Sequence, residues 1–96
     1  MATSKKISVD QLCVYYEVET KFVYALHDHG LITLAKSKKG YEIDFEHLGD
    51  FERFVHLHYE LEINMEGLEA ITHLLDRVKL LQQEIKQLRK KDIHEA

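Results

Sequence analysis

Apolar residues near the C-terminus recur at alternating steps of three and four, and this spacing restricts the possible folds more than any other feature. Such steps place side chains along one seam of a helix, the pattern of a coiled coil. At about 1.5 Å per residue, the seam would be about 27 Å long. A chain of 96 residues is too small to cover such a helix, so we expect a homodimer, parallel or antiparallel. The seam positions are Ile71, Leu74, Val78, Leu81, Ile85 and Leu88.

Two short helices are predicted in the first third of the chain. The run from Ser8 to Gln11 has the form of a capping box, so a helix should start at Ser8 and reach about Tyr16. A second helix should begin near Thr20 and end at Gly30, because glycine suits the left-handed conformation that follows many helices. Two short helices with a tight connection form a helix-turn-helix.

A small β-hairpin should follow the second helix. Residues 32–35 and 41–43 favour strands, and the polar, glycine-containing run 36–40 between them favours a turn. Asp44 can cap a third helix and Asn64 the long last one. We therefore expect a mainly α fold with a winged helix-turn-helix domain over residues 1–66. Residues 67–96 would form a C-terminal coiled-coil helix that dimerises and has a frayed tail.

Charge is distributed unevenly along the chain. The formal net charge is −4, yet residues 41–70 contain nine acidic residues and only Arg53 as a basic one, which gives −8. The segments on either side each carry a net charge of +2. The middle of the chain should therefore repel polyanions and attract a basic partner.

The sequence has neither a Gly-rich phosphate loop nor a nucleophile motif. His27 and His29 form one close pair and His56 and His58 another, but helical residues two apart point in different directions. Cys13 is the single cysteine, and we expect it to be buried and inert. The predictions are therefore no enzymatic activity, no cofactor and no metal site. Since no apolar run approaches the roughly 18 residues of a membrane span, we expect a cytoplasmic protein without membrane contact.

The stretch Thr20 to Ile32 has the outline of a DNA-recognition helix without its basic residues. Helices that read the major groove use Arg or Lys on phosphates and base edges. Here Lys21 is the only Lys or Arg, and Asp28 is negative. Wing lysines could follow a phosphate backbone, although a solvated turn is the commoner explanation for them. The candidate DNA-binding residues are Lys21, Lys36, Lys38 and Lys39.

Several segments together resemble the MerR-type winged helix over about residues 6–90. These segments are Ile7–Leu12, Thr20–Ile32, Gly40–Tyr41 and Leu61–Leu68. Within that superfamily, the run from Tyr59 to Gly67, YELEINMEG, is similar to a pattern of the CbpM chaperone-modulator branch. The resemblance implies binding to the J-domain of a CbpA/DnaJ-type co-chaperone. It also implies restraint of that protein's activity toward DnaK and of its DNA binding.

The sequence departs from DNA-binding MerR proteins at two contact sites. Those proteins carry an Arg-Tyr pair six and five residues before the glycine that ends the recognition helix, where this chain has Tyr24 and Ala25. They also carry an arginine after the wing tyrosine, where this chain has Glu42. Two principal phosphate contacts of those relatives are therefore replaced.

The resulting prediction is a non-catalytic chaperone modulator that binds a J-domain. A MerR-like DNA-binding transcriptional regulator is the alternative, and an adaptor subunit for an unrelated partner is a third. For the J-domain we expect a hydrophobic anchor, either Tyr24 or Leu34. The acidic residues expected to steer this partner are Glu19, Asp28, Glu42, Asp44 and Glu46.

Overall fold

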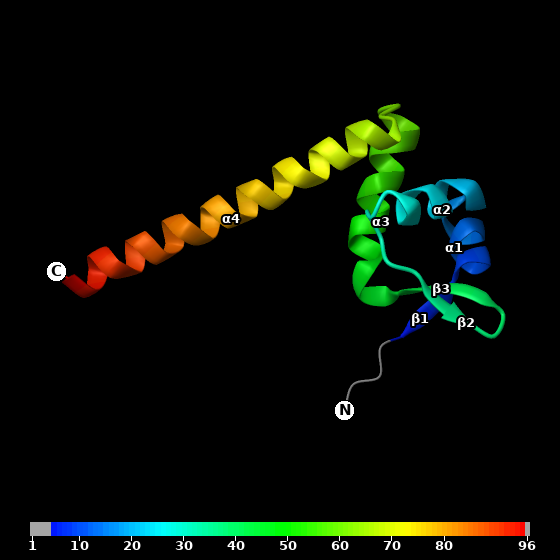
Figure 1. Ribbon diagram of the computed structural model, residues 1–96, viewed down its shortest axis with the longest axis horizontal. Helices are drawn as coiled ribbons and strands as arrows, with labels where there is room; N and C mark the ends of the chain where they lie inside the picture. The colour runs from blue at the N-terminus through cyan, green and yellow to red at the C-terminus, as the bar shows by residue number, and fades with distance from the viewer. Residues whose placement is uncertain (1–4, 96) are drawn as a thin grey trace.

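The computed structural model describes the backbone of residues 5–95 and the side chains of residues 5–91. It consists of a small body and one long helix, α4 (Met65–Glu95), which projects away from that body (Figure 1). The predicted boundary between residues 66 and 67 falls in the first turn of α4. The expected frayed tail concerns the chain end, where Ala96 lies outside the described residues. The fold is mainly α, as predicted.

Helices α1 (Val9–Tyr16) and α2 (Thr20–Asp28) form the predicted helix-turn-helix. The Ser8 hydroxyl accepts a hydrogen bond from the Gln11 backbone N–H at 3.1 Å, which caps α1 at the expected residue. Such a cap satisfies one of the donors that every helix start leaves unpaired. The prediction that Cys13 is buried is also confirmed.

A Schellman motif ends α2 at the predicted glycine. Gly30 has a φ of 73°, a conformation that glycine adopts without steric cost. Its N–H donates to the His27 carbonyl at 2.9 Å, and the Leu31 N–H donates to the Leu26 carbonyl at 2.9 Å. These two bonds define the motif and turn the chain from α2 toward the wing.

The wing is a three-stranded antiparallel sheet with strand order β1-β3-β2. Its strands are β1 (Lys6–Ser8), β2 (Ala35–Ser37) and β3 (Gly40–Asp44). The strand predicted at 32–35 begins three residues later, at Ala35, so this prediction is wrong. The reason is that Ile32 and Leu34 are buried in the core instead of pairing in the sheet. The turn therefore shortens to Lys38 and Lys39, a two-residue hairpin loop. Strand β1 was not predicted, since three residues are too few to show an alternating pattern.

The third helical segment begins at its predicted cap but is not one regular helix. Asp44 accepts a hydrogen bond from the Glu46 N–H at 3.2 Å and starts the 3₁₀ turn η1 (Phe45–His47). Helix α3 (Leu48–Val55) follows, and then the π-helical turn η2 (His56–Glu60). In η2 the His58 ring stacks on Phe22, with centroids 4.7 Å apart, and this contact ties η2 to α2.

Helix α4 is fixed to the body by its first turn. Asn64 caps it as predicted, accepting a hydrogen bond from the Gly67 N–H at 2.8 Å. A Cβ atom on Gly67 would lie 2.5 Å from Ile63 Cγ2, so this close approach requires glycine. Leu68 is completely buried among the residues of the body. One core thus joins the helix-turn-helix, the wing, α3 and the start of α4.

Candidate protein-interaction surfaces

The outward side of α2 carries a stripe of mixed charge. Phe22, Val23 and Leu26 of this helix are buried, which leaves Lys21, Tyr24 and Asp28 on the opposite side at three- and four-residue spacing. One positive, one aromatic and one negative side chain therefore occupy the surface that a DNA-reading helix would fill with basic residues.

An aromatic pair joins this stripe to the wing. The rings of Tyr24 and Tyr41 lie 5.8 Å apart at 79°, an edge-to-face arrangement that stabilises both side chains. They are 37% and 38% exposed, so both remain available to a partner. The prediction of Leu34 as the alternative anchor is wrong, because its side chain is buried in the core. We call the surface of Lys21, Tyr24, Asp28 and Tyr41 the helix–wing face.

The five predicted partner-binding acids occupy several separate places. Glu19 and Asp28 lie at opposite ends of α2. Glu42 follows Tyr41 on β3, and successive residues of a strand point to opposite faces, so Glu42 faces away from the helix–wing face. Asp44 caps η1, and Glu46 is exposed in that turn. Asp28 is thus the one acid that lies on the same face as the aromatic pair.

Glu42 instead belongs to a basic surface on the other side of the wing. It lines an open hollow together with Lys6, Lys38 and Lys39. Lys6 is the member that the sequence did not reveal, because it joins this surface only through the pairing of β1 with β3, which places it opposite Asp44. We call this surface the lysine hollow. Lys36, by contrast, pairs with Tyr41 across β2 and β3 and so shares the face of that tyrosine.

A second surface that the sequence did not reveal is an apolar groove beside α1. Its apolar lining is contributed by Ile7, Val14, Tyr15 and Phe45, from three segments that are separate in the sequence. The hydrophobic pattern of α1 explains only its buried side, namely Val9, Leu12 and Cys13. Periodicity could have flagged Val14 and Tyr15 as apolar residues off the core face, but nothing local connects them to Phe45.

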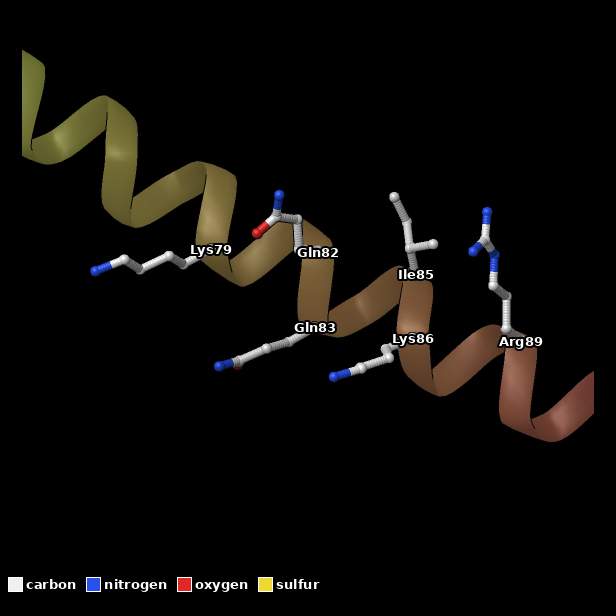
Figure 2. Close-up of a pocket in the computed structure, with 6 residues that line it drawn as sticks. All are labelled: Lys79, Gln82, Gln83, Ile85, Lys86 and Arg89. Atoms are coloured by element: carbon white, nitrogen blue, oxygen red, sulfur yellow. The ribbon is translucent and has the colours of Figure 1, made fainter.

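The predicted seam of α4 is exposed in the monomer. Ile71 is half-buried beside the body, and exposure at the other five seam residues ranges from 46% at Val78 to 62% at Leu74 and Leu88. Figure 2 shows part of this helix, where Gln82, Ile85 and Arg89 project to one side and Lys79 and Lys86 to another. The six labelled side chains line a shallow pocket. Because all six come from one helix, this pocket is an open surface. Around Ile85, the seam therefore lies on a different side of α4 from Lys79 and Lys86, which we call the basic stripe.

Three of the histidines each make a polar contact with one neighbouring group. His29 contacts Glu69, which links the end of α2 to α4, and His56 contacts Glu60 within one turn. His58 Nδ1 lies 2.8 Å from the Ile63 carbonyl oxygen. Among the described side chains, no group of three or more His, Cys, Asp or Glu residues is placed to hold a metal ion.

Cys13 and Tyr16 have raised pKa values, and the shift makes neither side chain reactive. Burial, followed by the charge of Asp10, raises the pKa of the Cys13 thiol, which keeps it protonated at neutral pH. Burial and a hydrogen bond donated to Glu52 raise the pKa of Tyr16 to about 12. Both groups have structural roles in the body.

Two short helices with a three-stranded wing beside the second define a winged helix-turn-helix protein. A sequence model of the family described as MerR HTH family regulatory protein matches residues 7–90. The chain belongs to this family. Comparison with curated proteins gave no match. None of the helices in the described part of the chain is both long and apolar enough to cross a membrane.

Proposed function

We propose that this protein is a non-catalytic chaperone modulator that binds the J-domain of a CbpA/DnaJ-type co-chaperone and restrains its activity. The observation that carries the proposal is the helix–wing face. This face holds Tyr24 and Tyr41 among Lys21, Lys36 and Asp28, which is the mixed polarity and aromatic content of a protein interface. Such a partner would place the protein in the cytoplasm.

The aromatic pair supplies the anchor that this proposal needs. Binding energy in protein interfaces is concentrated in a few side chains, and tyrosine is among the commonest of them. Tyr24 is held against Tyr41 before any partner arrives, so little conformational entropy is lost on binding. Asp28, one turn along α2 from Tyr24, can meet a basic side chain of the partner at the edge of this contact.

The acidic residues supply steering over a longer range. The resemblance implies that the partner surface is the Lys- and Arg-rich helix of the J-domain that faces DnaK. Opposite charges raise the rate of encounter and suppress wrong partners, while each exposed pair adds little affinity. Glu19, Glu42, Asp44 and Glu46 contribute in this way without touching the anchor.

The test is titration of the J-domain of a CbpA-type protein from the same genome. Tyr24→Ala should weaken binding about tenfold, which corresponds to about 1.4 kcal/mol, whereas the control Tyr15→Ala should bind like the wild type. Asp28→Lys should slow association and reduce its salt dependence, with Glu62→Lys as its charge-matched control. The wild-type protein should also lower the stimulation of DnaK ATPase by the co-chaperone. Absence of wild-type binding contradicts the function, and full binding by Tyr24→Ala contradicts the site.

A DNA-binding regulator is the second candidate, and the lysine hollow is the observation that favours it. Lys6, Lys38 and Lys39 at the wing can contact phosphates, giving weak and steeply salt-dependent binding. Selection from a random DNA library at physiological salt separates the two functions. Recovery of a defined palindrome with high affinity would favour the regulator over the chaperone modulator.

We also propose that the protein is a homodimer joined along the α4 seam. Support comes from the regular spacing of the six seam residues and from the exposure of the last five of them, from Leu74 to Leu88, in the monomer. Apolar side chains that recur in this way bury themselves against a second helix. In a parallel pair, Glu84 and Arg89 would face each other across the interface, which adds at most about 1 kcal/mol.

A further inference from the structure

The apolar groove gathers three of the exposed apolar side chains of the body. Val14 and Tyr15 are 79% and 76% exposed, and Phe45 is 46% exposed. Single exposed apolar residues are ordinary, but residues that gather in one groove mark an interaction site. These side chains are not needed for the core of the body, which closes beneath them.

Tyr15 is held in place within this groove. Its ring packs edge-to-face on Tyr16, with centroids 4.9 Å apart, and Tyr16 packs in turn on the core residue Phe51 at 5.2 Å. A large side chain that is exposed but already oriented binds a partner with little loss of entropy. Tyr15 is therefore suited to anchor a partner's apolar side chain.

The lysine hollow adjoins the groove directly. Lys6 and Gln11 line both. The hollow contains Lys6, Lys38 and Lys39 against Glu42, and Asp10 lines the adjoining groove, so the combined surface carries a local charge of +1 on a protein whose net charge is −4. An apolar surface is thus continuous with a positively charged one, on a protein whose net charge is negative.

We propose that the groove and the hollow together bind an acidic segment of a partner protein. The apolar side chains of that segment enter the groove between Val14, Tyr15 and Phe45, and its carboxylates meet the lysines. A basic partner would be repelled by the hollow. DNA would use the lysines and leave the groove empty. This surface differs from the helix–wing face, so partners of opposite charge can be held at the same time.

The probe is a short fluorescent peptide in which glutamates alternate with leucine and phenylalanine, titrated into the full-length protein and followed by anisotropy. Tyr15→Ser should weaken binding about tenfold, corresponding to about 1.4 kcal/mol. Leu80→Ser is the matched control, because Leu80 is an exposed apolar residue on α4. Since Tyr15 is largely exposed, circular dichroism should show an unchanged fold.

Charge variants provide the second part of the test. Lys38→Glu should weaken peptide binding and reduce its salt dependence, whereas Lys90→Glu on α4 should leave both unchanged. Glu42→Lys should strengthen peptide binding, although the same substitution should slow association with a J-domain. This opposite sign separates the present proposal from the proposed function.

Several outcomes would overturn the proposal. One is absence of peptide binding, and another is equal binding of a peptide with lysines in place of glutamates. If duplex DNA binds in a Lys38-dependent manner and the peptide does not, the hollow contacts phosphates. If Tyr15→Ser dissociates an assembly of the wild type in sedimentation, the groove joins copies of this chain instead.

Discussion

The body of the molecule and its long helix bury apolar side chains in different ways. In the body, side chains from α1, α2, the wing, α3 and the first turn of α4 enclose one another, and Leu12, Val23, Leu26 and Phe51 are completely buried. Along α4 beyond Leu68, a sequence pattern just as regular leaves its apolar residues about half exposed. The same periodicity therefore has two structural meanings, according to whether the chain itself provides the opposite surface.

This difference predicts where the protein depends on a second copy. The stability of the body should depend on its own packing and change little with protein concentration. The seam of α4 should be stable only when another helix covers it, so its contribution should depend on concentration. Substitutions placed in the two regions can test that separation.

The largest effect is expected from Val78→Asp at the centre of the seam. An uncompensated buried charge costs about 3–5 kcal/mol, and a dimer would contain two of them. Sedimentation should show monomers where the wild type is dimeric. The control is Lys79→Asp, which introduces the same carboxylate on the neighbouring basic stripe. A Val78→Asp protein that remains dimeric would show that the seam is not the interface.

Phe51→Ala tests whether the stability of the body depends on its own packing. Phe51 has no exposed surface and packs against Tyr16 and Phe22. Its truncation should lower the free energy of unfolding by about 3–5 kcal/mol. Urea unfolding at several protein concentrations measures this loss, which should be similar at each. A loss that vanishes at high concentration would mean that the body is stabilised mainly by the partner copy.

How far the sequence predicted this structure depended on whether the deciding interactions were local. The caps at Ser8, Asp44 and Asn64 and the glycine turn at Gly30 involve residues within a few positions of each other, and each was predicted at the correct place. Strand β2 was predicted too early in the chain, because the β-prone residues Ile32 and Leu34 pack into the core instead of forming the sheet. That choice depends on residues far away in the chain.

The candidate surfaces follow the same rule. The stripe on α2 could be predicted from one helical period. The position of Glu42 among lysines could not, because it depends on pairing between β1 and β3. The apolar groove also depends on residues from distant segments. Family membership established the type of fold, but a surface assembled from several elements required the three-dimensional structure.

The junction between the two regions is tested by Gly67→Ala. The added methyl would meet Ile63 at 2.5 Å, and such overpacking costs about 1–3 kcal/mol, partly offset by about 1 kcal/mol of better helix propensity. We expect net destabilisation of about 1 kcal/mol. Gly49→Ala in α3 is the control, because its added methyl meets nothing within 4 Å and should stabilise slightly. Thermal denaturation that gives both variants the same sign would contradict the close contact.

The smallest effect concerns the body alone at high pH. Burial, and then the bond to Glu52, raises the pKa of Tyr16 from 10.0 to about 12. A raised folded-state pKa contributes stability below pH 10 that is lost as the pH rises toward 12. Tyr16→Phe should lose about 1 kcal/mol at neutral pH and show a shallower decline across this alkaline window. Urea titrations at each pH measure this decline in the free energy of unfolding, with Tyr15→Phe as control. If Tyr16→Phe leaves the slope of stability against pH unchanged, Tyr16 is not the group that causes the decline.

The attachment of α4 to the body through its N-terminal turns also makes the helix a lever. The 31 residues of α4 extend about 46 Å, so a rotation of about 10° at its base moves the far end by about 8 Å. In the proposed dimer, the angle at which α4 leaves the body would therefore determine how far apart the two bodies stand. A methyl group at Gly67, which would meet Ile63 at this corner, is expected to alter that separation, although it lies on neither of the proposed binding surfaces.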